Sequence, residues 1–353
     1  MTPNKNLLFL RKVIYTEMKP CCYVATTPRL NAIAAFFHAV QCAIVFGLIG
    51  WLNSQPYGNT NFRVEKYVNV WHKFENKTVV ESMIKNRAAM NKDFYVQFKT
   101  LDVGSLDVRY IVAFFFLLSA AFQTWGAYVL NPKTVFRLRF LEYSFSASIM
   151  MLAIAVETGF RDVYILEMMF ILIWSTMIFG IMADFMSDVV TYLDGSAFVE
   201  EPLLIWLGPW AWIIPHFAGW VTCCAAYIPV IDMFMQSSKE SEAKAPGFVH
   251  VIVFLQFVLF SCFGLVQFYA LAMRTMILQS RDHSIPIEMM RQNGVGEDEE
   301  RFIEDSRGSY KTMRLMITME NAERAYITLS FVAKTLLAWL ILSPIIANAA
   351  QSD

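Results

Sequence analysis

The sequence predicts an all-α membrane protein whose core is a bundle of seven transmembrane helices. Of its 353 residues, 56% are hydrophobic and 17% are charged, whereas soluble domains usually carry about 25% charged residues. A helix needs about 20 mainly apolar residues to cross a hydrocarbon core of about 30 Å, and seven stretches are long enough. Their apolar runs are continuous rather than alternating, which favours helices over a β-barrel. The expected spans are residues 31–52, 108–130, 135–157, 163–186, 203–233, 248–277 and 317–347.

The segments outside the spans are uneven in length. The seven-helix domain covers residues 31–347, with residues 1–30 before it and residues 348–353 after it. Within the long loop 53–107, the stretch NFRVEKYVNVWHKFENKTVV alternates apolar and polar side chains. This pattern predicts a short β-hairpin. Residues 279–314 form a second long loop, which contains the acidic run GEDEERFIED.

Lysine and arginine residues near the ends of the spans predict the orientation of the chain, because these residues gather on the cytoplasmic side. They are frequent before the first span, after the second and after the sixth, whereas the short loops on the other side hold Arg161, Lys239 and Lys244. The amino terminus and loop 279–314 are therefore expected in the cytoplasm. Loop 53–107 and the carboxyl terminus are then extracellular. The formal net charge of −1 argues against a nucleic-acid partner.

Lys334 lies in the middle of the seventh span, in the stretch SFVAKTLLAW. A lysine at the centre of a spanning helix costs roughly 2.5 to 3.5 kcal/mol on translocon scales. Snorkelling to the membrane surface works near helix ends, but Lys334 is about thirteen residues, or roughly 20 Å, from the far end of its span. The lysine therefore needs a carboxylate partner, deprotonation or chemical modification.

The best partner for Lys334 is Glu142, which lies within the third span in the stretch RFLEYSFSAS. Ser146 follows Glu142 by one helical turn, and Ser330 precedes Lys334 by one turn. Each charged residue thus has a hydroxyl neighbour on its own helix face. We expect these side chains to form one site inside the bundle.

The two motifs together resemble the heliorhodopsins, a family of retinal-binding seven-helix photoreceptors. EYSFSAS places Glu142 in the family's counterion position, and Ser330-x-x-x-Lys334 places the lysine in the retinal-linking position. HAVQ in the first span is similar to the family's His-x-x-Gln and gives His38 and Gln41. A cytoplasmic amino terminus and a long first outside loop are also family traits.

The resemblance implies a light-absorbing protein in the lipid bilayer rather than an enzyme, and it also implies a homodimer. Lys334 is then expected to bind all-trans retinal as a protonated Schiff base, with Glu142 as its counterion. No metal site is expected. The other side chains expected around retinal are Ser330, Ser146, Tyr143, Trp174 and Phe263.

His38 and Gln41 are candidates for receiving or relaying the Schiff-base proton. Heliorhodopsins usually have a histidine in the second helix, where this sequence has Ser119 and Gln123. Gln123 is therefore a third candidate. A histidine on an apolar helix is often a packing residue, so the sequence leaves both roles open for His38.

Two routes could follow the absorption of light. In the first, the protein is a sensor that changes a cytoplasmic surface read by a signalling partner. In the second, it is a light-gated proton or cation channel. The channel hypothesis depends on acids toward the cytoplasmic ends of the spans and on one further acid in the fourth span. These acids are Asp184, Asp188, Glu200, Glu201, Glu320 and Glu323, together with Glu167.

Overall fold

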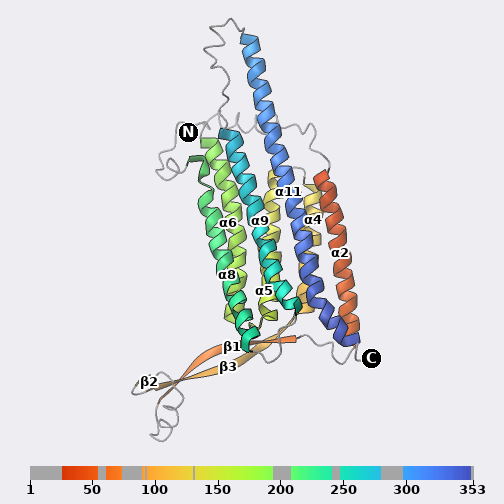
Figure 1. The fold of residues 1–353 in the computed structure, drawn as a ribbon, viewed down its shortest axis with the longest axis vertical. Helices are drawn as coiled ribbons and strands as arrows, with labels where there is room; N and C mark the ends of the chain where they lie inside the picture. Colours follow the sequence, from red (N-terminus) through yellow and green to blue (C-terminus); the bar gives the residue numbers. More distant parts are fainter. Residues whose placement is uncertain are drawn as a thin grey trace, which may run out of the picture.

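The computed structural model describes residues 26–54, 61–73, 90–91, 94–129, 132–193, 208–240, 247–279 and 297–350. Within these ranges it contains seven helices that are long and apolar enough to cross a membrane, which confirms the predicted fold class. They run side by side as an elongated bundle (Figure 1). The helices are α2 (Thr26–Leu52), α4 (Val108–Tyr128), α5 (Pro132–Glu157), α6 (Val163–Leu193), α8 (Ile213–Glu240), α9 (Gly247–Gln279) and α11 (Glu297–Ala350).

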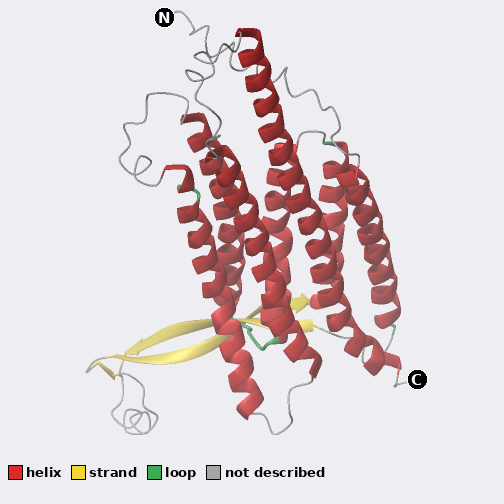
Figure 2. Cartoon of the chain, turned by 45° about the horizontal axis from the view of Figure 1, so that its top comes forward, coloured by secondary structure: helices red, strands yellow, loops and turns green. Residues whose placement is uncertain are grey.

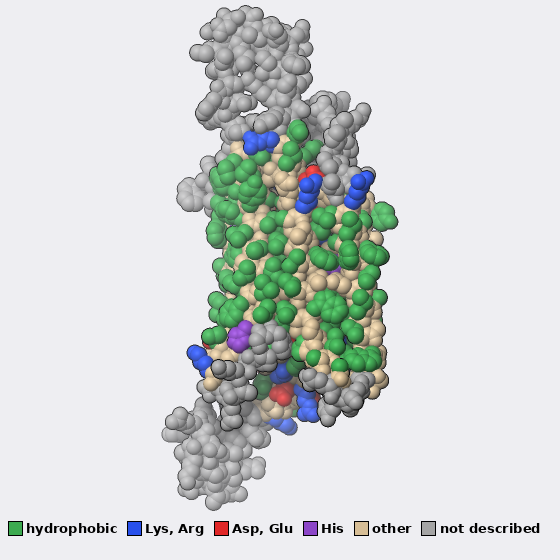
Figure 3. Space-filling model, turned by 45° about the vertical axis from the view of Figure 1, so that its right-hand side comes forward, with side chains coloured by type: hydrophobic (Ala, Val, Ile, Leu, Met, Phe, Trp, Pro, Cys, Tyr) green, Lys and Arg blue, Asp and Glu red, His purple; other side chains and the backbone are tan. Residues whose placement is uncertain are grey.

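Helix α5 is the central helix of the bundle. It contacts α4, α6, α9 and α11, and 72% of its most apolar window is buried, compared with 28–44% for the other spans. The outer faces of the other helices carry large apolar side chains, such as Phe36 on α2 and Leu265 on α9. Hydrophobic side chains cover most of the flank of the bundle seen in Figure 3. Such a surface is suited to lipid, so buried polar groups are expected on the faces that the helices turn toward one another.

The predicted hairpin is confirmed, and it is longer than expected. Strand β1 (Asn61–Lys73) pairs antiparallel with β3 (Phe94–Asp107), from Asn61 opposite Asp107 to Lys73 opposite Phe94. The two-residue strand β2 (Met90–Asn91) completes a sheet in the order β1-β3-β2. The sheet lies beyond one end of the bundle and projects to the side (Figure 2).

Contacts at the base of the hairpin join it to the helices. The register shifts between Val64 and Glu65, and the amide of Glu65 donates a 2.8 Å hydrogen bond to the carbonyl of Arg161, between α5 and α6. The Arg161 guanidinium lies 4.5 Å from the centre of the Phe62 ring. Strand β3 ends at Asp107, whose carboxylate caps α4 by accepting a hydrogen bond from the amide of Arg109. The sheet is therefore fixed at its base to three helices.

Several helix boundaries differ from the predicted spans, and three of the helix starts are informative. The first helix begins at Thr26 rather than near residue 31, and α11 begins at Glu297, so the second half of the expected loop 279–314 is helical. Four consecutive acidic residues open α11, a composition that suits a helix amino terminus. The fifth span begins at Ile213 rather than near residue 203, because Gly208, at a φ of 51°, opens a short 3₁₀ turn before it. Residues 203–207 and 280–296 lie outside the described ranges.

Candidate functional site

Lys334 and Glu142 meet in the interior of the bundle. Lys334 on α11 is 2% exposed and Glu142 on α5 is fully buried. The lysine Nζ lies 2.7 Å from Glu142 Oε1 and also donates a hydrogen bond to the hydroxyl of Ser119 on α4. The Tyr143 ring lies beside the amine, with 5.3 Å between its centre and Nζ. The structure thus brings together the two charges that the sequence places on separate spans.

Arg139 is the main site residue that the sequence analysis missed. Its Nη1 donates to Glu142 Oε2 at 2.7 Å, and its Nη2 lies 2.6 Å from Glu323 Oε1 on α11. Nη2 also donates to Asn31 Oδ1 on α2 at 2.5 Å. Arg139 precedes Glu142 by three residues, a spacing that places both on one helix face. That spacing is the signal in the sequence that could have found it.

The four charges form a buried series that is neutral in sum. Lys334, Glu142, Arg139 and Glu323 alternate in sign, and each is less than 5% exposed. A buried ion pair must offset the cost of removing both charges from water, and losing one partner leaves the other uncompensated. Glu142 uses Oε1 for the lysine and Oε2 for the arginine. Its two oxygens therefore connect the amine to the rest of the series.

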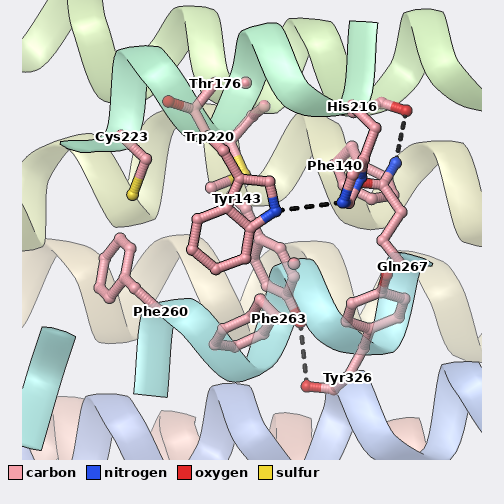
Figure 4. A pocket seen from close by; sticks show the side chains of 14 residues that line it. Phe140, Tyr143, Thr176, His216, Trp220, Cys223, Phe260, Phe263, Gln267 and Tyr326 are labelled. Atoms are coloured by element: carbon pink, nitrogen blue, oxygen red, sulfur yellow. Dashed lines mark hydrogen bonds between the residues drawn. The ribbon is translucent and has the colours of Figure 1, made fainter. Parts of the chain in front are cut away.

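Two adjoining cavities extend from Lys334 into the bundle. The first has a volume of about 300 Å³, part of it open to the surroundings, and is lined by Lys334, Ser146, Ser330 and apolar residues. The second encloses about 520 Å³, part of it open to the surroundings, and reaches Trp220 and His216 on α8. Figure 4 shows the aromatic rings around this second cavity. The side chains that line both cavities are Tyr143, Met177, Phe260 and Phe263.

Most of the side chains expected around retinal line these cavities. Tyr143 and Phe263 stand edge to face with ring centres 5.0 Å apart, and the Tyr143 hydroxyl donates to the Tyr326 carbonyl at 3.0 Å. Trp174 is the exception among the expected residues: it lines neither cavity, and its side chain is 38% exposed on α6. The tryptophan that lies at the cavity is Trp220, which the sequence could not distinguish from the other tryptophans.

The three expected relay residues lie in different surroundings. His38 is fully buried, with ring-centre distances of 5.6 Å to Phe116 and 5.4 Å to Phe331. Within the described residues, neither of its ring nitrogens has a hydrogen-bond partner, and the same is true of the Gln123 amide. Gln41 donates to Thr335 Oγ1 on α11 at 3.0 Å. The relay role stays a prediction.

The acids proposed for conduction are mostly held in ion pairs. Asp184 lies 2.9 Å from Arg137 on α5, and Arg274 on α9 reaches both Asp184 and Asp188. Glu323 pairs with Arg139, and Glu320 lies 2.5 Å from Arg324.

Glu167 lies within the fourth span, as expected, but it does not face the bundle interior. It lies in the second turn of α6 and is exposed, near the hairpin residue Lys66. Glu200 and Glu201 lie outside the described residues.

The site has the chemical features that retinal requires. A buried primary amine lines the first of two adjoining cavities, whose walls are mainly aromatic and other apolar side chains. A carboxylate at 2.7 Å from the amine can balance a cation formed there. Two hydroxyls at the first cavity, those of Ser146 and Ser330, have no hydrogen-bond partner among the described residues. These residues fit a polyene aldehyde attached to Lys334.

Comparison with known families agrees with this chemistry. The heliorhodopsin family model matches residues 28–276, a range that includes Glu142 and ends before α11. A search of curated proteins found no match. The family consists of retinal-binding rhodopsins, and the matched range covers more than half of the chain. The chain therefore belongs to the heliorhodopsin family and is a retinal-binding, light-sensing rhodopsin of the membrane.

Proposed function

We propose that the protein signals light through all-trans retinal bound to Lys334 as a protonated Schiff base, with Glu142 as the counterion. The observation that carries this proposal is the 2.7 Å contact between Lys334 Nζ and Glu142 Oε1 at the end of the aromatic cavity. Bound at this amine, retinal supplies light absorption and a change of shape on isomerisation. A carboxylate about 4 Å from the cation contributes roughly 4 kcal/mol at an effective dielectric constant near 20.

The surrounding side chains have distinct roles in this proposal. Arg139 holds Glu142 Oε2 and so directs Oε1 toward the amine. Ser119 offers a second acceptor to the proton on the amine. Tyr143 and Phe263 line the cavity and exclude water from it, which strengthens the electrostatic interaction between the cation and Glu142.

Glu142→Gln is expected to shift the visible absorption of the pigment to longer wavelength. Removing the negative charge lets the positive charge spread along the polyene. When the pH is raised, the visible band should also be lost at a lower pH than in the wild type. The expected difference is about three pH units, because this corresponds to the roughly 4 kcal/mol of lost stabilisation. Absorption spectra recorded across a pH titration of the purified pigment measure both effects.

Glu157→Gln is the matched control for this substitution. Glu157 is the last residue of the same helix, α5, and lies outside both cavities. The control should keep the wild-type spectrum and titration. A Glu142→Gln pigment with the wild-type spectrum and titration would show that another group balances the cation.

The ion pairs favour a sensor over a channel. Asp184, Asp188 and Glu323 each have an arginine partner, so moving ions through this region would require breaking buried pairs. We propose that the bundle end bearing these pairs faces the cytoplasm and that the hairpin is extracellular, in line with the distribution of lysine and arginine. A cytoplasmic partner would then read changes at the ends of α5, α6 and α9.

One observation supports light-gated proton or cation conduction as the second candidate. The buried series from Lys334 through Glu142 and Arg139 to Glu323 leads away from the amine. It ends one helical turn from Glu320, which accepts a hydrogen bond from Thr27 at the start of α2. This series is a polar route between the site and one end of the bundle.

Illumination of voltage-clamped cells that express the protein separates the two candidates. We expect no photocurrent alongside a complete photocycle, because the ion pairs close the route. Cells expressing Lys334→Ala give the background signal. A photocurrent that is present in wild type and absent in this variant would establish conduction instead.

A further inference from the structure

The end of the cavity system farthest from Lys334 is built by helices α6, α8 and α9. His216 and Trp220 come from α8, Gly264 and Gln267 from α9, and Gly180 from α6, and all five line the second cavity. The first cavity, which contains Lys334, includes none of them. In Figure 4 the indole of Trp220 lies between the α8 ribbon and the rings of Phe260 and Phe263, with its nitrogen directed toward His216. Trp220 thus forms part of the wall of the second cavity and does not line the first.

A series of hydrogen bonds holds the indole in this position. The Trp220 indole nitrogen donates to His216 Nε2 at 3.1 Å. An indole N–H can only donate, so His216 Nε2 must be the unprotonated nitrogen and Nδ1 carries the hydrogen. His216 Nδ1 then donates to Gln267 Oε1 at 3.3 Å, and Gln267 Nε2 donates to the Gly180 carbonyl at 2.8 Å. The series fixes both the histidine tautomer and the plane of the indole.

Two glycines provide the space for the aromatic walls. A Cβ atom at Gly264 would lie 2.6 Å from Cζ2 and 2.8 Å from Cε2 of Trp220. A Cβ atom at Gly180 would lie 2.5 Å from the Phe140 ring. Side chains of real proteins do not approach so closely, so an alanine at either position would displace the ring.

The hydrogen-bonding side chains that α6, α8 and α9 contribute to this end are already paired, whereas the hydroxyl of Tyr326 on α11, which also lines the second cavity, has no hydrogen-bond partner among the described residues. His216 and Gln267 use both of their side-chain polar atoms within the series, and the Thr176 hydroxyl bonds to Leu172 and Thr222. A polar ligand group placed beside His216, Gln267 or Thr176 would therefore have to break an existing hydrogen bond, which costs binding free energy. The geometry favours an apolar group of limited size.

We propose that His216 is a positioning residue that, together with Gly264, fixes Trp220 as the end wall of the cavity and thereby selects retinoids by the size of their ring. This inference rests on the proposed function, because it requires the retinoid to be attached to Lys334. His216 acts through Trp220.

The test compares pigment formation with two probes, all-trans retinal and an acyclic analogue that has the same polyene but lacks the ring. In Gly264→Ala, the displaced indole should slow pigment formation with retinal about tenfold or more, while the acyclic analogue is little affected. The double variant Gly264→Ala/Trp220→Phe should recover the rate with retinal, because the smaller ring leaves room for the new methyl group. Gly50→Ala is the control, since a Cβ atom at Gly50 would meet no atom within 4 Å.

His216→Leu removes the acceptor of the indole hydrogen bond. We expect a shifted absorption maximum and a smaller difference in rate between the two probes. His216→Gln, which keeps one acceptor and one donor, should restore both properties toward wild type. A purely structural role for His216 would lower pigment yield with both probes and leave the absorption maximum unchanged.

Two outcomes separate failure of this inference from failure of the proposed function. If wild type forms no pigment with retinal, the proposed function is wrong and the inference fails with it. If wild type forms pigment but Gly264→Ala slows both probes equally, only the end-wall assignment is overturned.

Discussion

Lys334→Ala is expected to abolish pigment formation with all-trans retinal completely. Lys334 is the amine at the cavity, it is 2% exposed, and within the described residues no other lysine lines either cavity. An imine cannot form without a primary amine, so the loss should not depend on retinal concentration. Absorption spectroscopy of the purified variant after addition of retinal measures the effect.

Two controls make this result specific to the amine. Lys99→Ala, at an exposed position of strand β3, should leave pigment formation unchanged. In Lys334→Gly, the space vacated by the side chain should accept retinal supplied as its imine with a small alkylamine, which would restore colour without a covalent link to the protein. A visible pigment formed by Lys334→Ala and free retinal would refute the attachment site.

Arg139→Met is expected to have the second largest effect. It removes the partner of Glu323 and one partner of Glu142, both buried. Breaking a buried pair in this way costs about 3–5 kcal/mol of stability, because the remaining charge is uncompensated. The absorption should shift to shorter wavelength, opposite to the shift in Glu142→Gln, since the full charge of Glu142 then acts on the cation. Thermal denaturation and absorption spectra measure the two effects.

Arg324→Met is the matched control for the stability effect. Arg324 pairs with Glu320 on the same helix, α11, but its side chain is 41% exposed, and exposed pairs of this kind contribute about 1 kcal/mol or less. The double variant Arg139→Met/Glu323→Gln should regain part of the lost stability, because it removes the unpaired carboxylate. If Arg139→Met and Arg324→Met lowered stability equally, the buried series would not be an important stabilising feature.

The seven helices could be predicted from the sequence because the membrane imposes a minimum length of apolar residues on each span. Boundaries were less predictable, since they depend on capping and turn geometry at individual residues. The 3₁₀ turn that Gly208 opens before the fifth span and the acidic start of α11 illustrate this. The alternating pattern of residues 61–80 predicted the hairpin. Its length could not be predicted in the same way, because it depends on the pairing of β1 with a second strand more than 20 residues away.

The site was predictable to the extent that charge inside the membrane is costly. Lys334 and Glu142 each stand out within an apolar span, and opposite charges there are expected to meet. Arg139 and Glu323 lie nearer the ends of their spans, where charges are common, so their burial depends on how α5 and α11 pack. Trp174 and Trp220 have similar apolar neighbours in sequence. Only the rotation of α6 and α8 about their axes distinguishes the exposed tryptophan from the one at the cavity.

The length of α11 has a mechanical consequence. Lys334 belongs to the same continuous helix as Glu297, and this helix rises beyond the ends of its neighbours in Figure 1. The 37 residues between these two positions span about 55 Å at 1.5 Å per residue. A tilt of about 5° around Lys334 would therefore move the protruding tip by about 5 Å. The helix can act as a lever that enlarges a small displacement at the amine.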